Sequence, residues 1–168
     1  MDGTKSPEAP RAWKTYQDER IRLAYPEDWK VLHAKFQTGN EEMWSIEPPG
    51  ENKGEPGAVS ISEEKGAKRR PLEYFVETEN KNMISGRRFI NPPRKLKLKI
   101  GNCLSYPMEY RHGKIFNAKI RSHCYRDNGN YVSISAHIGN YVDNTKPDED
   151  SLKNARIYER VLESLEFQ

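Results

Sequence analysis

The stretch LSYPMEYRHGKIFNAKIRSHCYRDNGNYVSISAHI, residues 104–138, decides the fold of this chain. It holds three runs in which apolar and polar residues alternate, and groups containing Gly113 and Gly129 separate the runs. Alternation over this length is typical of half-buried strands, and glycine-containing groups between such runs are typical of hairpin turns. The stretch therefore predicts three successive antiparallel strands.

The second hairpin of this block has a predictable loop length. Its apolar faces match only if Cys124 lies opposite Val132 or Ile134. A three-residue loop at 127–129 meets this condition, with Gly129 in the left-handed bulge position. A two-residue Asn-Gly turn would place the apolar residues of the third strand on the wrong face, so we predict the three-residue loop.

We expect the three strands to present their apolar sides to one common interior, so that Leu104, Ile120 and Ile134 share a face. On that alignment Cys103 lies off the apolar face and Cys124 lies on it. Two thiols on opposite sides of a sheet cannot reach disulfide geometry. The sequence thus predicts reduced cysteines, although a bulge at the HGK turn, residues 112–114, would allow the pair to form.

The chain before this block predicts further strands. Residues 13–26 read as a short strand or hairpin, and EMWSIE and AVSISEE read as two more strands on either side of a Pro- and Gly-rich loop at 48–57. In RLAYPEDWKV, residues 22–31, Pro26 ends a strand because it lacks a backbone donor. Tyr25 and Trp29 there form either an aromatic platform for a ligand or a structural corner with Trp29 in the core. We favour the corner because tryptophan is usually largely buried.

Two segments change to a helical period. RPLEYFVETENKNMI, residues 70–84, places apolar side chains on one helix face after Pro71, which suits a first turn. TKPDEDSLKNARIYERVLESLEF, residues 145–167, begins with Pro147 and an acidic group that the helix dipole favours. We therefore expect helices in both segments.

Size and composition favour one folded domain. The chain has 168 residues, a net charge of +3, and 3 Trp, 9 Tyr and 5 Phe, which argue against disorder. We expect residues 1–12 to form a flexible leader and residues 13–168 to form a single domain. No apolar run approaches the ~18 residues of a membrane span, and no export signal begins the chain.

These features together resemble the PsbP-like superfamily. The resemblance lies in the aromatic-rich entry, IRLAYPEDWKV with Tyr25, Pro26 and Trp29, the Gly/Pro loop into AVSIS, PLEYFVETENKNM, the meander and the closing YERVLESLEF. The superfamily includes a photosystem II extrinsic protein, a Ran-binding import factor and bacterial lipoproteins. The resemblance implies an α+β fold, an α/β/α sandwich around a central antiparallel sheet, and a non-catalytic accessory role whose partner differs between members.

Catalytic and metal-binding patterns are weak in this sequence. His123 and Cys124 are strand neighbours that point to opposite faces, which disfavours a shared metal. The four histidines read as surface or inter-strand residues, and Ser60, Ser62, Ser133 and Ser135 as solvent-face residues without a nucleophile elbow. GENKGEPG lacks the ending of a phosphate loop. We therefore expect no enzyme activity, no cofactor and no metal.

The best functional candidate is a basic group. It comprises Lys68, Arg69, Arg70, Arg87, Arg88, Arg94, Lys95, Lys97 and Lys99. We select six of these as the predicted partner-binding set: Arg87, Arg88, Arg94, Lys95, Lys97 and Lys99. If Lys95, Lys97 and Lys99 alternate with leucines, they line one face of a strand. The competing interpretation is an edge strand that lysines protect from aggregation.

The sequence predicts a monomeric accessory module whose basic edge meets an acidic protein surface or an anionic membrane. Nucleic acid is a less favoured partner and would require strongly salt-dependent binding. A small-ligand carrier or an enzyme would require a deep pocket with convergent polar groups. We expect an extracytoplasmic location, exported or lipid-anchored, with the cytoplasm as the alternative.

Overall fold

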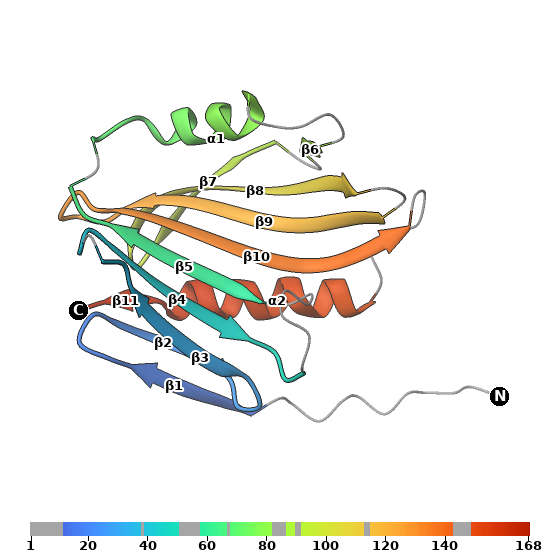
Figure 1. Cartoon of the computed structure of the whole chain (residues 1–168), viewed down its shortest axis with the longest axis horizontal. Coiled ribbons are helices and arrows are strands. Elements are labelled where there is room, and N and C mark those ends of the chain that lie inside the picture. The colour runs from blue at the N-terminus through green and yellow to red at the C-terminus, as the bar shows by residue number, and fades with distance from the viewer. Residues whose placement is uncertain are drawn as a thin grey trace.

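The structure, a computed structural model, describes residues 12–37, 39–50, 58–66, 68–81, 87–89, 92–112, 115–142 and 149–168. Within these ranges the strands form two antiparallel sheets, and two helices pack against them (Figure 1). The predicted α+β class with antiparallel sheets is confirmed. The predicted leader, most of the loop at 48–57, Met83 and Pro147 lie outside the described residues.

The elements follow the predicted order with several additions. The strands before the first helix are β1 (Trp13–Gln17), β2 (Ile21–Pro26), β3 (Lys30–Lys35), β4 (Glu41–Glu47) and β5 (Val59–Glu64). Those after it are β6 (Arg87–Phe89), β7 (Arg94–Leu98), β8 (Gly101–His112), β9 (Ile115–Tyr125), β10 (Tyr131–Val142) and β11 (Glu166–Phe167). The helices are α1 (Leu72–Lys81) and α2 (Glu149–Ser164). The small sheet has the order β1-β2-β11, and the large sheet has the order β3-β4-β5-β10-β9-β8-β6, with β7 also paired to β8.

The corner predicted at residues 22–31 is confirmed. β2 ends at Pro26, and the backbone N–H of Trp29 donates to the Pro26 carbonyl at 3.0 Å. Trp29 is buried in the main core, at 8% exposure, rather than forming a platform. A second sheet is present beside the large one, because this corner takes β1 and β2 out of the large sheet.

The hairpin between β9 and β10 has the predicted loop. Cys124 pairs with Val132, and the Arg126 N–H donates to the Asn130 carbonyl at 3.0 Å, which leaves residues 127–129 as the loop. Gly129 has a φ of +88°, the left-handed conformation that a three-residue hairpin loop needs at this position. The face-matching argument therefore holds for this hairpin.

The same argument fails for the hairpin between β8 and β9. His112 pairs with Ile115, and this register places Cys103 opposite Cys124 and Leu104 opposite His123. Leu104 therefore lies on the other side of the sheet from Ile120 and Ile134, contrary to the prediction. The cysteines form a disulfide with their Cα atoms 4.1 Å apart, so the prediction of reduced thiols is wrong.

The physical reason is that this part of the large sheet is buried on both faces. One face carries the main core, which includes Ile134, Cys103 and Cys124 together with Val161 and Leu165 from the end of the chain. The other face carries a smaller cluster of Val76 and Leu72 from α1 with Leu104, Tyr106 and Met108 from β8. Because both faces of the sheet are apolar here, the alternating apolar residues of β8 do not indicate which face of the sheet they occupy.

The last helix is shorter than predicted. α2 ends at Ser164, whose hydroxyl donates to the Val161 carbonyl and accepts a hydrogen bond from the Ala24 backbone N–H, both at 2.8 Å. The chain then leaves the helix and forms β11, which pairs with β2 at Arg22 and Ile21. The predicted continuation of the helix to Phe167 is wrong, because the chain end completes the small sheet.

Two acidic side chains connect the small sheet to the large one. The buried carboxylate of Glu63 on β5 pairs with Arg20, beside the β1–β2 turn, and with Arg126, after β9. Asp18 accepts hydrogen bonds from the Trp44 indole at 2.8 Å and from the backbone N–H groups of its own turn. Burial opposes ionisation of Asp18, but these hydrogen bonds outweigh it and lower the pKa of Asp18 to about 2.

The edge of the large sheet at β8 is occupied by two short strands. β6 pairs with β8 at Tyr110 to Met108, and β7 pairs with the same edge of β8 at residues 105–101. The turn from β7 into β8 passes through Gly101, whose φ is +137°. A Cβ at Gly101 would lie 2.0 Å from the Tyr125 carbonyl oxygen, so this close approach requires glycine.

We predict that breaking the disulfide lowers the stability of the fold. Replacing both cysteines by alanine, C103A/C124A, releases a link across 21 residues, and we expect the free energy of unfolding to fall by about 3 kcal/mol. Urea unfolding of the oxidised protein and the double variant measures this difference. The oxidised protein should also weigh two hydrogens less than its reduced form. Alkylation of both thiols in unfolded protein kept free of reductant would contradict the bridge.

Candidate functional site

An open groove lies between the start of α1 and the strands β7, β8 and β9. Two adjoining cavities, of about 540 and 530 Å³, form it, and both are lined by Leu72 and Asn102. The first also touches Arg69, Arg70, Pro71, Tyr125, Arg126 and Asp127. The second also touches Glu73, Lys95, Leu96, Lys97, Cys103 and Leu104. We call these residues together the basic groove.

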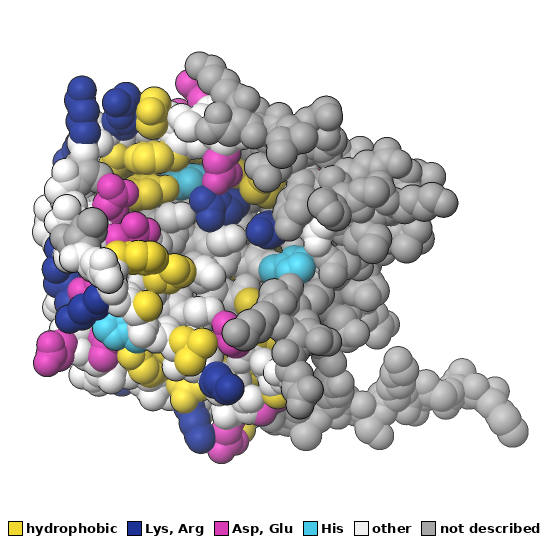
Figure 2. Space-filling view, viewed as in Figure 1, with side chains coloured by type: hydrophobic (Ala, Val, Ile, Leu, Met, Phe, Trp, Pro, Cys, Tyr) yellow, Lys and Arg dark blue, Asp and Glu magenta, His cyan; other side chains and the backbone are white. Residues whose placement is uncertain are grey.

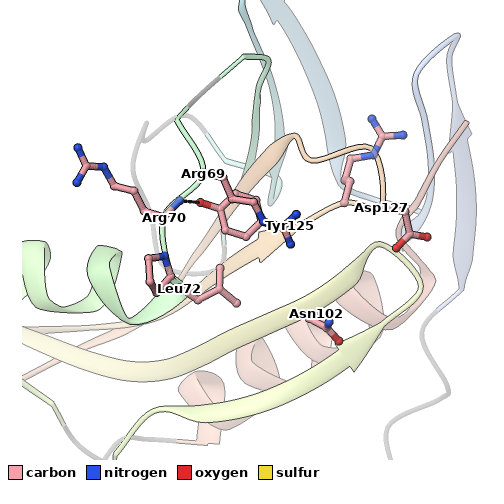
Figure 3. Close-up of a pocket in the computed structure, with 8 residues that line it drawn as sticks. Arg69, Arg70, Leu72, Asn102, Tyr125 and Asp127 are labelled. Atoms are coloured by element: carbon pink, nitrogen blue, oxygen red, sulfur yellow. Dashed lines mark hydrogen bonds between the residues drawn. The ribbon is translucent and has the colours of Figure 1, made fainter.

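Tyr125 positions one wall of the groove. Its hydroxyl accepts a hydrogen bond from the backbone N–H of Arg70 at 2.8 Å, so the segment entering α1 is fixed to the end of β9 (Figure 3). The Arg69 guanidinium lies over the Tyr125 ring at 5.4 Å, and that of Arg70 lies over Tyr74 at 4.3 Å. Asn102 and Asp127 lie across the pocket from Arg70 (Figure 3).

The groove carries more positive than negative charge. Arg69, Arg70, Lys95 and Lys97 form no ion pair with any residue that the structure describes, whereas Arg126 is held by Glu63. Glu73 and Asp127 are the acidic lining residues of the two cavities. Figure 2 shows Lys and Arg side chains grouped where the chain enters α1. The groove can therefore attract an anionic ligand or surface.

The six residues of the predicted partner-binding set do not share one face. Lys95 and Lys97 are exposed and line the groove. Arg94 lies on the other face of β7 from Lys95 and Lys97. Lys99 follows the end of β7 and forms an ion pair with Glu166 at 3.0 Å. Arg87 and Arg88 lie in β6, next to β8, and their side chains are outside the described part. A continuous face made by Lys95, Lys97 and Lys99 is therefore wrong, because Lys99 is in the turn.

Sequence reasoning placed Arg69 and Arg70 in the basic group but did not select them, and it missed Asn102, Tyr125 and Arg126. The signal for Arg69 and Arg70 was their position directly before Pro71 and a helix start. Asn102 and Tyr125 meet only through the pairing of β8 with β9, and that register was predicted wrongly. No local pattern marks them.

A second polar cluster lies beneath α1, outside the groove. Arg121 donates to Glu79 of α1 at 2.8 Å, and the Tyr106 hydroxyl lies 2.8 Å from His123 Nε2 and also bonds to Glu79. Tyr131 bonds to the other ring nitrogen of His123, and Phe75 of α1 stacks on Tyr131 at 4.2 Å. This network fixes α1 to the sheet.

His123 is uncharged in this network near neutral pH. Burial, and after it the charge of Arg121, lowers the pKa of His123 to about 4. Burial also raises the pKa of Tyr131 to about 12. Of the two positions predicted for the histidines, surface or inter-strand, His123 takes the inter-strand one: it bonds to Tyr106 on β8 and Tyr131 on β10 and is only 2% exposed. Its opposite orientation to Cys124 is confirmed by the separate contacts of the two side chains.

The serines predicted to have no catalytic role lie on two neighbouring strands, β5 and β10. Ser60 pairs with Ser135 and Ser62 with Ser133, all half-buried, so the four serines lie side by side on one face of the large sheet. Among the described residues, no group of three or more His, Cys, Asp or Glu side chains is arranged to hold a metal ion. Nor does any helix in those ranges have the length and apolar character needed to cross a membrane.

Fold and groove together define an α+β protein of two antiparallel sheets with a basic groove at one end. No family model and no curated protein matches the sequence. Among solved structures, the chain is similar to the crystal structure of LpqN, a protein involved in cell envelope biogenesis of Mycobacterium tuberculosis. The TM-score is 0.54 at 13% identity, over 96% of this chain and 87% of that one. At this identity the likeness shows the fold alone.

We predict that the buried His123 makes stability depend on pH. The histidine is neutral in the folded protein down to about pH 4 but takes up a proton near pH 6.5 when unfolded. Stability should therefore fall as pH drops from 6.5 to 4, by roughly 3 kcal/mol in total from this group. Urea unfolding at several pH values measures the slope in wild type and in H123F.

H123F lacks the histidine, so its free energy of unfolding should depend less on pH between 4 and 6.5 than that of the wild type. This should hold even if the variant is less stable at every pH. Between pH 7 and 8, where His123 is neutral in both states, the wild type and the variant should show the same slope. An unchanged slope in H123F between pH 4 and 6.5 would contradict the assignment.

Proposed function

We propose that this chain is a non-catalytic binding module that engages an acidic segment of a protein partner through the basic groove. The observation that carries this proposal is the set of four cations, Arg69, Arg70, Lys95 and Lys97, around an open groove without an ion pair to any described residue. Unneutralised charges of one sign at a concave surface speed the association of an oppositely charged partner.

We further propose that the module belongs to the PsbP-like superfamily, with α1 and α2 as the outer layers of an α/β/α sandwich. The similarity to LpqN supports this proposal at the level of the fold. So do the contacts of the two helices: Phe75 of α1 stacks near His123, whereas Tyr158 of α2 lies 2.6 Å from the hydroxyl of Ser122, the neighbouring residue on the opposite face.

An extracytoplasmic location is part of the same proposal. The Cys103–Cys124 bridge supports it because structural disulfides persist mainly in oxidising compartments. The role of LpqN in the cell envelope is consistent with it. The accessory role, close to a membrane surface or bound to an envelope protein, follows from this location and from the charge of the groove.

We predict that reversing two groove charges weakens binding of an acidic peptide. The variant K95E/K97E replaces both groove lysines, and we expect the dissociation constant to rise by about tenfold. Fluorescence anisotropy with a labelled Glu-rich peptide measures this change, with a Lys-rich peptide of equal length as the reference. The matched control is K30E/K35E, which makes the same charge change at exposed positions of β3, the opposite edge of the sheet.

Equal affinity of wild type and K95E/K97E for the acidic peptide would contradict the proposal that the basic groove binds the acidic segment. A single-stranded oligonucleotide that binds more tightly than the acidic peptide at physiological salt would favour the nucleic-acid alternative instead.

A further inference from the structure

We propose that the acidic partner binds as an added β-strand along the free edge of β7, and that its side chains alternate between acidic and apolar. This inference rests on the proposed function, because it specifies how the same basic surface receives the acidic segment. It concerns β7, residues Arg94–Leu98 (Figure 1), and the part of the groove that Lys95, Leu96 and Lys97 line.

Within the part of the chain that the structure describes, β7 is an edge strand with one unpaired side. Among the described strands it pairs with β8 only, through five residue pairs from Arg94–Ser105 to Leu98–Gly101. An edge of this kind presents a row of backbone N–H and C=O groups to which an extended segment can add. The lysines that discourage addition of a like-charged strand favour one that carries acidic side chains.

The two faces of β7 differ in chemistry. Lys95 and Lys97 lie beside Leu104 and Asn102 on the face that lines the groove, and both lysines are exposed. Leu96 and Leu98 lie on the other face, are half-buried and pack against the main core, and Leu96 also reaches the second cavity at the strand edge. A strand added to β7 would continue both faces.

Cross-strand neighbours determine which side chains fit at each position. Residues opposite Lys95 and Lys97 gain an oppositely charged neighbour when they are acidic, and residues opposite Leu96 and Leu98 gain contact when they are apolar. Because side chains alternate along a strand, the complementary segment must alternate with a period of two. Arg69 and Arg70, at the other end of the groove, can meet acidic residues that extend beyond the strand.

This pattern separates strand addition from general attraction of negative charge. A cationic groove alone would bind any peptide of sufficient negative charge, whatever its order of residues. Strand addition requires the alternating order and backbone hydrogen bonds along one side of the peptide. The two explanations therefore give different results for peptides of the same composition.

The experiment uses the whole chain with its disulfide intact and four labelled peptides. One peptide alternates Glu and Val, and a second has the same composition with all Glu before all Val. The other two are alternating peptides that are N-methylated on every second residue, in one frame or the other. Anisotropy gives the affinities, and NMR spectra report the amide signals of residues 95–98.

We expect the alternating peptide to bind about tenfold more tightly than the block peptide and to shift the β7 amide signals. Only one of the two N-methylated peptides should lose binding, because only one set of its N–H groups faces β7. The variant K95E/K97E should prefer an alternating Lys and Val peptide instead, and K30E/K35E should behave as wild type.

Equal affinity for the alternating and block peptides, or equal loss with both N-methylated peptides, would overturn strand addition. If these peptides still bound more weakly to K95E/K97E, the proposed function would stand without it. If no acidic peptide bound at all, both the proposed function and this inference would be rejected.

Discussion

The relative positions of the two sheets and the groove depend on the two ion pairs that the buried carboxylate of Glu63 forms. This carboxylate lies buried on β5 and pairs with Arg20 from the small sheet and with Arg126 from the end of β9. Arg126 also lies over the ring of Phe167 in β11 at 4.2 Å. A buried carboxylate is tolerated only when it is paired and hydrogen-bonded. The charge of Glu63 therefore holds β1–β2, the chain end and the loop beside the groove in one arrangement.

The same use of carboxylates explains why the groove stays positively charged. Glu63 is taken by two arginines, Glu79 by Arg121, and Glu166 by Lys99. These three carboxylates form ion pairs that connect different strands and helices. They are therefore not paired with the groove cations Arg69, Arg70, Lys95 and Lys97. A small net charge for the whole chain is therefore compatible with a strongly basic local surface.

The sequence was informative where a local rule determined the structure. The loop after Tyr125 follows from Gly129 and from the match of Cys124 with Val132, and the corner follows from Pro26. It was misleading at β8, where Leu104, Tyr106 and Met108 pack beneath α1 instead of joining the main core. One strand with two buried faces cannot be oriented from its apolar residues, so the register and the disulfide were both predicted wrongly.

The groove was only partly predictable for a related reason. Arg69 and Lys95 are far apart in the sequence and line opposite ends of one groove because α1 lies above the pairing of β7 with β8. Composition showed that cations were concentrated in this part of the chain. It did not show that Lys99 would be diverted to Glu166, or that Arg94 would lie on the other face.

Gly101 has a consequence for how this protein can vary through evolution. Any other residue at this position would bring a Cβ to 2.0 Å from the Tyr125 carbonyl oxygen, next to the pair of Asn102 and Tyr125 that lines the groove. Substitutions at position 101 are therefore excluded as long as β8 and β9 keep this spacing. A chain of the same fold with another residue at this position would have to hold the end of β9 farther from the start of β8.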